Sequence, residues 1–187
     1  MITLSQLASA LYGVWLLLKL DPRGFDYFEK TPGGFARSFL VAAVLSPLYF
    51  AHAVLTYHGH KTKLAFMPYL VVQTLSDVLS WVAFPFAMLY VTELLSRQGR
   101  YLTYMVGYNW FQLAVGCALL PIAVLADLGF LSMKFAGFLN LLALVVFFTF
   151  GAFIARIGLQ LGVGTAVGIV VIDLMLSLAI NQAIGRI

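Results

Sequence analysis

The residues best suited to chemistry are two aspartates that lie within long apolar stretches. Asp77 interrupts the apolar run of residues 64–92, and Asp173 interrupts the run of residues 157–184. In helical form these aspartates lie roughly 20 Å and 24 Å from the starts of their runs. A carboxylate in hydrocarbon costs roughly 3 kcal/mol or more, so it must be paired, hydrated or protonated. Each aspartate is therefore either part of an ion or proton site or a hydrogen-bonded pin between helices.

Uncharged polar side chains in the apolar runs could complete such a site. Gln73 lies one helical turn before Asp77, and Ser177 lies one turn after Asp173, so each shares a face with its aspartate. A pair between Asp77 and His52 is a further hypothesis, which requires two neighbouring helices to pack at matching depth. Other polar candidates within the runs are Asn109, Gln112, Asn140, Asn181 and Gln182.

Composition indicates that the elements holding these residues are membrane-crossing helices. The 187-residue chain is 63% hydrophobic and 10% charged, whereas an ordinary soluble domain is about 25% charged. A soluble fold would expose large apolar patches and aggregate. A helix needs about 20 apolar residues to cross a bilayer. We therefore predict an all-α, polytopic transmembrane helical bundle with five spans, at residues 38–57, 64–92, 101–126, 135–155 and 157–184.

The amino-terminal residues 1–37 form a unit distinct from the five-span domain of residues 38–187. Five apolar residues recur there at spacings of three or four, which places them on one stripe of a helix: Leu4, Leu7, Leu11, Trp15 and Leu18. We predict an amphipathic helix that lies in the membrane interface. A break at residues 21–24 and a short polar stretch at residues 25–34 follow it. The alternative is a sixth span at residues 3–20, whereas a cleaved signal peptide is disfavoured because no lysine or arginine precedes the apolar stretch.

Basic residues between the runs predict the orientation of the chain, because cytoplasmic loops carry an excess of lysine and arginine. The amino-terminal side holds Lys19, Arg23, Lys30, Arg37, Arg97, Arg100 and Arg156. The opposite side holds Lys61, Lys63, Lys134 and Arg186. This distribution predicts a cytoplasmic amino terminus. The formal net charge of +4 thus sets orientation and gives no reason to expect a nucleic-acid partner.

The sequence gives little support to catalysis and none to a bound cofactor or metal. Neither H-E-x-x-H nor G-x-S-x-G occurs, and the chain has only three histidines and seven acidic residues. The single cysteine excludes an intrachain disulfide. His58 and His60 lie in a connection, and a solvated loop is favoured over a metal site because catalytic zinc usually has three protein ligands.

Glycines are concentrated where the last two runs meet. Gly158 and Gly162 are four residues apart, as are Gly164 and Gly168. Small residues at this spacing let two helices approach closely. We predict tight packing at these glycines within the chain, and the alternative is packing in a homodimer.

A short amino-terminal segment followed by five closely spaced helices resembles the Yip family of five-span membrane proteins, whose eukaryotic members associate with Rab GTPases and vesicles. The likeness covers residues 34–187 as architecture. The Asp-Leu-Tyr-Gly-Pro type of signature is missing, and residues 21–25 only faintly match it, so no functional residue is transferred. The compact form is most similar to the bacterial relatives, which implies a bacterial inner membrane. The resemblance implies a non-enzymatic scaffold or interaction protein, with the lipid bilayer, other membrane proteins or a second copy as partners. The alternative is a small transporter or proton-coupled carrier that uses Asp77 and Asp173.

Overall fold

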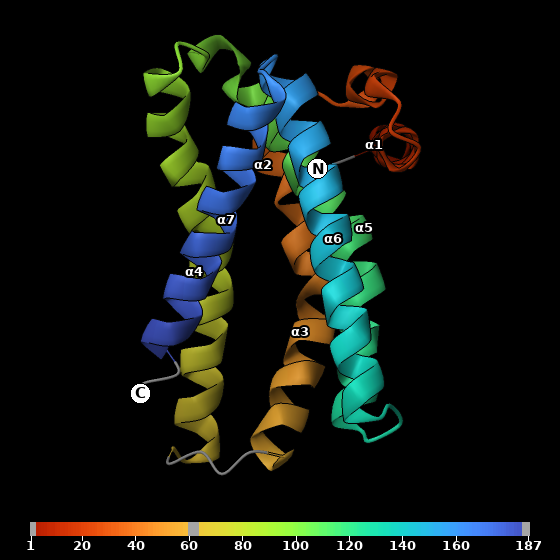
Figure 1. Cartoon of the computed structure of the whole chain (residues 1–187), viewed down its shortest axis with the longest axis vertical. Coiled ribbons are helices and arrows are strands. Elements are labelled where there is room, and N and C mark those ends of the chain that lie inside the picture. Colours follow the sequence, from red (N-terminus) through yellow and green to blue (C-terminus); the bar gives the residue numbers. More distant parts are fainter. Residues whose placement is uncertain (1–2, 60–63, 185–187) are drawn as a thin grey trace.

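The computed structural model describes residues 3–59 and 64–184, and every regular element in these ranges is a helix (Figure 1). This confirms the predicted all-α class. In chain order the elements are α1 (Leu4–Leu18), η1 (Pro22–Tyr27), α2 (Pro32–Ser38), α3 (Leu40–Gly59), α4 (Phe66–Leu94), η2 (Gln98–Arg100), α5 (Tyr101–Asp127), α6 (Met133–Leu159) and α7 (Val163–Ile184).

Five stretches of the described chain are long and apolar enough to cross a membrane: Pro32–Tyr57, Phe66–Leu94, Gln98–Asp127, Lys134–Leu159 and Val163–Ile184. Large apolar side chains stay exposed along them, including Phe50, Leu75 and Leu141. Lipid tails solvate such side chains without the penalty that water would impose. The five long helices therefore fit an integral membrane protein, in agreement with the predicted number of spans.

The long helices stand in two groups. α3, α5 and α6 pack together, and α7 contacts both α6 and α4. In Figure 1, α4 and α7 stand at the left and α3, α5 and α6 at the right. The two groups meet near the end where α1 lies and diverge toward the opposite end. The two aspartates line cavities between α3, α4 and α7.

α1 crosses the direction of the bundle. Figure 1 shows this helix end-on, whereas the five long helices run along the vertical axis. It has 15 residues, too few to cross the hydrocarbon core. Both observations favour a helix at the membrane interface over a sixth span.

α1 has two apolar sides. The spacing of its leucines predicted only one of them. Leu11 and Trp15, on the predicted stripe, are exposed and available to lipid. Ala10, Val14 and Leu17 are buried against the rest of the protein. α1 is thus attached to the bundle through one face and presents another to the surrounding hydrocarbon.

Phe25 is inserted between α5 and α6 and is 4% exposed. A Cβ atom on Gly107 would lie 2.5 Å from the Phe25 ring, and one on Gly158 would lie 3.2 Å from it. These two glycines therefore make the socket for the ring. The prediction that residues 25–34 form a polar stretch is therefore wrong for Phe25. A single aromatic residue in a turn is not part of a periodic pattern, so the sequence did not mark it as buried.

The turn between the last two long helices lies later than predicted. α6 continues through Arg156 to Leu159, and the chain reverses at Gln160, whose φ is 54° in the left-handed region. The prediction of a joint near Arg156 is therefore wrong. Arg156 lies in the last turn of α6, where the unpaired carbonyl groups attract a positive charge. A basic residue at such a position therefore indicates that a helix end is near, but not where the helix ends.

The four glycines near this turn have different surroundings. Gly158 is buried in α6, and a Cβ atom there would lie 3.1 Å from Cα of Tyr104, so the prediction of close packing is confirmed for it. Around Gly162, Gly164 and Gly168 no other described atom lies within 4 Å of the position that a Cβ would take. Close packing of these three within the chain is therefore wrong, and packing against another chain stays a prediction.

Candidate functional site

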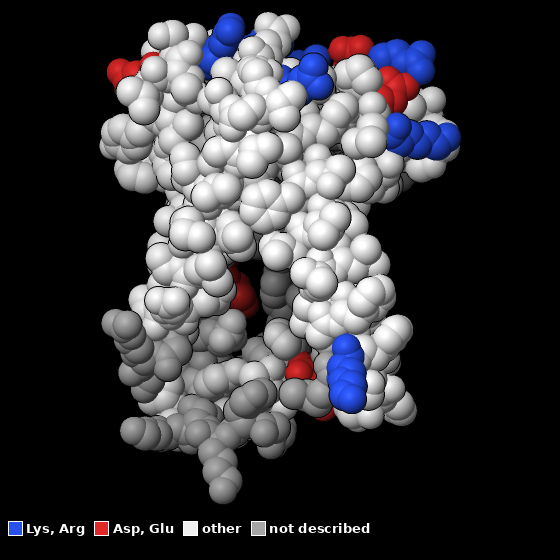
Figure 2. All heavy atoms as spheres, viewed as in Figure 1, with Lys and Arg blue, Asp and Glu red and all other residues white. Residues whose placement is uncertain are grey.

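Two cavities lie in the space between the helix groups, and each contains one of the aspartates. The first, the Asp77 cavity, has a volume of about 570 Å³, lies between α3 and α4, and is also lined by Gln73. The second, the Asp173 cavity, has a volume of about 260 Å³ and is surrounded by α3, α4, α5, α6 and α7. Tyr49 and Trp81 line both cavities and form their shared wall. Figure 2 shows the molecule hollowed in this region, with acidic atoms at the edge of the opening.

Both aspartates lie far from the ends of their helices. Asp77 is eleven residues from the nearer end of α4, and Asp173 is ten residues from the nearer end of α7. At about 1.5 Å per residue, each carboxyl lies about 15 Å or more along a helix from its terminus. Neither is therefore a helix cap, and both occupy the middle part of a membrane-crossing segment.

Asp173 is the more enclosed of the two and is 6% exposed. The hydroxyl of Tyr108 donates a hydrogen bond to its Oδ2 over 2.8 Å. Nε2 of Gln112 donates in turn to the Tyr108 hydroxyl over 2.7 Å. Tyr108 and Gln112 are four residues apart on α5, so one face of that helix presents both groups to α7. The result is a short relay of polar groups that ends at a buried carboxyl.

Asp77 lies at the wall of the larger cavity and is half-buried. The side chain of Gln73, one turn earlier, forms a hydrogen bond with it, in agreement with the spacing. His52 is directed to a different carboxyl: its Nδ1 lies 2.6 Å from Oδ2 of Asp127. The hypothesis of an Asp77–His52 pair is therefore wrong. Asp127 is the last residue of α5, where the helix dipole disfavours a negative charge, so an imidazole partner is favourable there.

No lysine, arginine or histidine of the described chain forms an ion pair with Asp77 or Asp173. Within the same residues there is also no group of three or more histidine, cysteine, aspartate and glutamate side chains suited to a metal ion. Among the described residues, the Asp173 carboxyl accepts a hydrogen bond from one neutral group, the Tyr108 hydroxyl. Such a site is completed either by a proton on the carboxyl or by a small cation that neutralises it.

The remaining polar candidates lie elsewhere. Asn109 is fully buried, and its Nδ2 donates to Oγ of Ser38 over 2.8 Å, which ties α5 to α2. Asn140, Asn181 and Gln182 are exposed on the outer sides of α6 and α7. The structure therefore brings Gln73 and Gln112 close to the aspartates and leaves the asparagines apart from them.

Sequence reasoning missed Tyr108, Tyr49 and Trp81 as residues of this site. Aromatic side chains are so frequent in this chain that none of the three stands out by type. One signal was present, because Tyr108 and Gln112 are four residues apart and must share a helix face. No signal in the sequence joins α5 to Asp173, because that contact depends on the packing of α7 against its neighbours.

Comparison with family models, with curated proteins and with solved structures finds no match to this chain. The functional argument therefore rests on the geometry of the two cavities.

Proposed function

We propose that this chain is a small membrane transport protein that moves protons or a small monovalent cation through the two aspartate cavities. The observation that carries this proposal is the environment of Asp173, which is buried in the middle of α7 and, within the described part of the chain, hydrogen-bonded to the neutral hydroxyl of Tyr108 alone. A carboxyl placed there is stabilised by a proton, by a bound cation or by water in the cavity, and the first two make it a site for reversible exchange. Reversible exchange of that kind is the elementary step of proton-coupled and cation-coupled carriers.

The arrangement of the two cavities supports a path between them. Asp77 and Asp173 lie on opposite sides of the wall made by Tyr49 and Trp81. In this proposal, rotation of either aromatic side chain joins the two cavities. A proton or cation can then pass from one carboxyl to the other. In this proposal Tyr49 and Trp81 are the gate, and the Tyr108 hydroxyl holds the Asp173 carboxyl in place.

A scaffold of the Yip type is the alternative that the architecture favours, because it needs only the five spans and an interfacial helix. Such a protein has no use for a buried carboxyl other than as a structural pin. Asparagine can accept the hydrogen bond from Tyr108 equally well, but it can neither take up a proton nor neutralise a cation. Replacing Asp173 by asparagine therefore separates transport from a purely structural role.

The distribution of charge also supports an orientation. Figure 2 shows that most basic side chains of the described residues lie at the end of the bundle where the α1 region lies. Under the positive-inside rule this end faces the cytoplasm. In the same orientation, we propose, the Asp77 cavity opens toward the half of the bilayer farther from the cytoplasm.

The experiment that tests the proposal is flux into vesicles reconstituted with the purified protein. Proton flux is followed with an enclosed pH-sensitive dye, and sodium and potassium flux with ion-selective dyes. Wild-type protein should conduct one of these ions above empty vesicles, Asp173→Asn should lower that flux at least tenfold, and Asp77→Asn should lower it less.

Asp26→Asn is the matched control, because Asp26 is an exposed carboxyl in η1 that lies outside both cavities. Flux through this variant should equal that through the wild type. Wild-type flux in Asp173→Asn would overturn the transport proposal. Equal flux of all three ions in empty and protein-containing vesicles would also overturn the transport proposal. That result would favour the scaffold alternative.

A further inference from the structure

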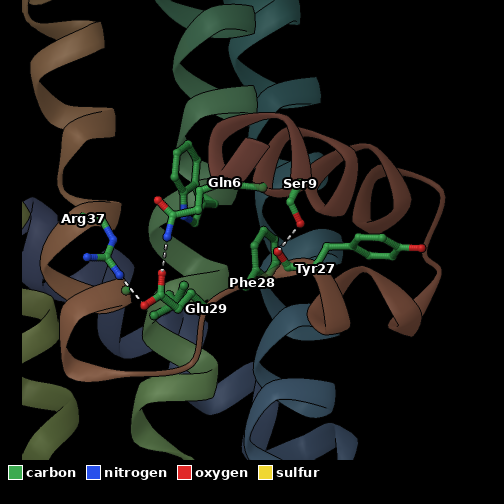
Figure 3. A pocket seen from close by; sticks show the side chains of 10 residues that line it. Gln6, Ser9, Tyr27, Phe28, Glu29 and Arg37 are labelled. Atoms are coloured by element: carbon green, nitrogen blue, oxygen red, sulfur yellow. Dashed lines mark hydrogen bonds and ion pairs between the residues drawn. The ribbon is translucent and has the colours of Figure 1, made fainter. Parts of the chain in front are cut away.

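A third cavity, of about 320 Å³, lies at the opposite part of the molecule from the splayed helix ends. It is enclosed by α1, by the segment that follows η1, and by α2, with α5 behind it (Figure 3). We refer to it as the α1 pocket. Its polar lining residues are Gln6, Ser9, Glu29 and Arg37, and Trp110 of α5 is among its apolar ones. None of them lines either aspartate cavity.

The α1 pocket lies where the apolar part of the protein meets its charged end. The outward side of α1 presents Leu11, Trp15 and Leu18 to the surroundings. The side that carries Gln6 and Ser9 borders the pocket instead. A helix that lies in the interface with its apolar side in the acyl chains places its polar side at the level of the lipid headgroups. The pocket is therefore at headgroup depth.

Two opposite charges lie side by side in the pocket. Figure 3 shows the Arg37 guanidinium directed at the Glu29 carboxylate, and the two form an ion pair. Glu29 is held from two further sides, because Nε2 of Gln6 donates to its Oε2 over 3.3 Å and Oγ1 of Thr31 donates to its Oε1 over 3.0 Å. The hydrogen bonds from Arg37 and then from Thr31 lower the pKa of Glu29 below its ordinary value of 4.5, so the carboxylate is ionised at neutral pH.

The Arg37 guanidinium keeps donors for a ligand. Of its five N–H groups, those on Nη2 supply its hydrogen bond to Glu29, and no other bond from it to a described side chain is present. Gly33 adjoins it, and a Cβ atom there would lie 3.4 Å from Nη2, so the glycine leaves this side of the guanidinium uncovered. A planar guanidinium with free N–H groups is the preferred protein partner of a phosphate group.

The pairing of charges selects among ligands. A purely anionic ligand at Arg37 would be repelled by Glu29, and a purely cationic ligand at Glu29 would be repelled by Arg37. A ligand that carries a phosphate and an ammonium group a few bonds apart satisfies both residues. We propose that the α1 pocket binds the zwitterionic headgroup of phosphatidylethanolamine, with its phosphate against Arg37 and its ammonium group against Glu29. The acyl chains of the lipid then lie along the exposed apolar side of α1. This proposal is independent of transport through the aspartate cavities.

Native mass spectrometry of the purified protein, titrated in detergent with phosphatidylethanolamine or phosphatidylglycerol, tests the proposal. The wild type should bind phosphatidylethanolamine about tenfold more tightly, which corresponds to ~1.4 kcal/mol. Glu29→Gln leaves the pocket with a net positive charge and should reverse the preference in favour of phosphatidylglycerol. Arg37→Gln removes the phosphate partner and should weaken the binding of both lipids.

Lys30→Gln and Asp26→Asn are the matched controls. These residues form an exposed ion pair at 3.5 Å in the same segment but outside the pocket. Each control changes the net charge by the same amount as its counterpart in the pocket and should keep the preference for phosphatidylethanolamine. Circular dichroism and the melting temperature establish that each variant is folded. If Glu29→Gln does not fold, the lipid binding of Arg37→Gln tests the proposal in its place.

The pH dependence has a definite sign. Glu29 contributes its negative charge above its lowered pKa and loses it as pH falls through that value, which lies below 4.5. The wild-type preference should therefore persist from neutral pH down to that range and then move toward phosphatidylglycerol, as in Glu29→Gln.

Three results would overturn the proposal. One is equal binding of the two lipids by the wild type, and another is a Glu29→Gln variant whose preference is unchanged. The third is displacement of phosphatidylethanolamine by inorganic phosphate alone, since that would identify a site for a free anion rather than for a lipid headgroup. Persistence of the lipid in the presence of inorganic phosphate supports the lipid as the source of the ligand.

Discussion

The ring of Phe25 fills the space between η1, α5 and α6, whereas cavities remain between α3, α4 and α7. In the first region, which we call the packed end, the ring of Phe25 is inserted against Gly107 and Gly158. In the second region, the open middle, Asp77 and Asp173 line cavities of about 570 Å³ and 260 Å³. The apolar helices α5 and α6 take part in both regions, so hydrophobicity does not distinguish them.

The difference lies in the size and polarity of the facing side chains. Glycines at the packed end let an aromatic ring approach the helix backbones, which maximises van der Waals contact in a medium where burial from water is not the driving force. In the open middle, tyrosine, tryptophan, glutamine and aspartate side chains line the cavities and provide polar groups. The packed end is therefore suited to hold the bundle together, and the open middle to exchange a ligand.

The largest expected effect on stability comes from emptying the socket at the packed end. Phe25→Ala should lower the free energy of unfolding by about 3–5 kcal/mol, as for other buried aromatic residues, because it leaves a cavity between α5 and α6. Denaturation in mixed micelles measures it. Phe130→Ala is the control, because Phe130 is 74% exposed and should change the free energy of unfolding by less than about 0.5 kcal/mol. Equal losses in the two variants would show that the packed end is not where stability resides.

Two glycine substitutions sharpen the comparison. Gly158→Ala forces a Cβ atom to within 3.1 Å of the Tyr104 backbone and should lower the free energy of unfolding by about 1–3 kcal/mol. Gly164→Ala meets no described atom within 4 Å and lies in a helix, so it should leave stability unchanged or raise it by up to about 1 kcal/mol. A loss for Gly164→Ala as large as that for Gly158→Ala would indicate instead that Gly164 packs against another chain.

A smaller effect is expected in the open middle. Tyr108→Phe removes the donor to Asp173 and the acceptor of Gln112, and should lower the free energy of unfolding by about 1 kcal/mol. The same variant should alter flux through the Asp173 cavity, because the carboxyl loses the group that positions it. Unchanged stability together with unchanged flux would contradict the role given to this hydroxyl.

The smallest effect is expected at Cys117, which is exposed on α5. Cys117→Ser should change the free energy of unfolding by no more than about 0.5 kcal/mol, since the side chain fills no enclosed space. Thermal unfolding of the two proteins in the same detergent measures it. A larger loss would place Cys117 in a contact with another chain.

The sequence predicted the helical class, the number of spans and the helix lying outside the bundle, because each depends on local composition and period. The end of α6 was misplaced, since a charge such as Arg156 marks the neighbourhood of a helix end and not its last residue. Phe25 could not be recognised as a core residue, because its socket is made by glycines more than eighty residues away in the chain. The aspartates were identified by type, but their partners were not: the contacts of Asp173 with Tyr108 and of His52 with Asp127 depend on how helices pack.

Accessibility of single cysteines along α7 tests the central claim that water reaches the open middle and its two aspartates. In the Cys117→Ser background, cysteines are introduced one at a time at Ser177, which lines the Asp173 cavity, at Ala166, which is buried, and at Met175, which is exposed on the outer side of the helix. Each protein, reconstituted in vesicles, is treated with a charged, water-soluble thiol reagent. The account predicts that only Ser177→Cys reacts, because Ala166→Cys is enclosed and Met175→Cys lies in lipid. Failure of Ser177→Cys to react, or equal reaction at all three positions, would contradict it.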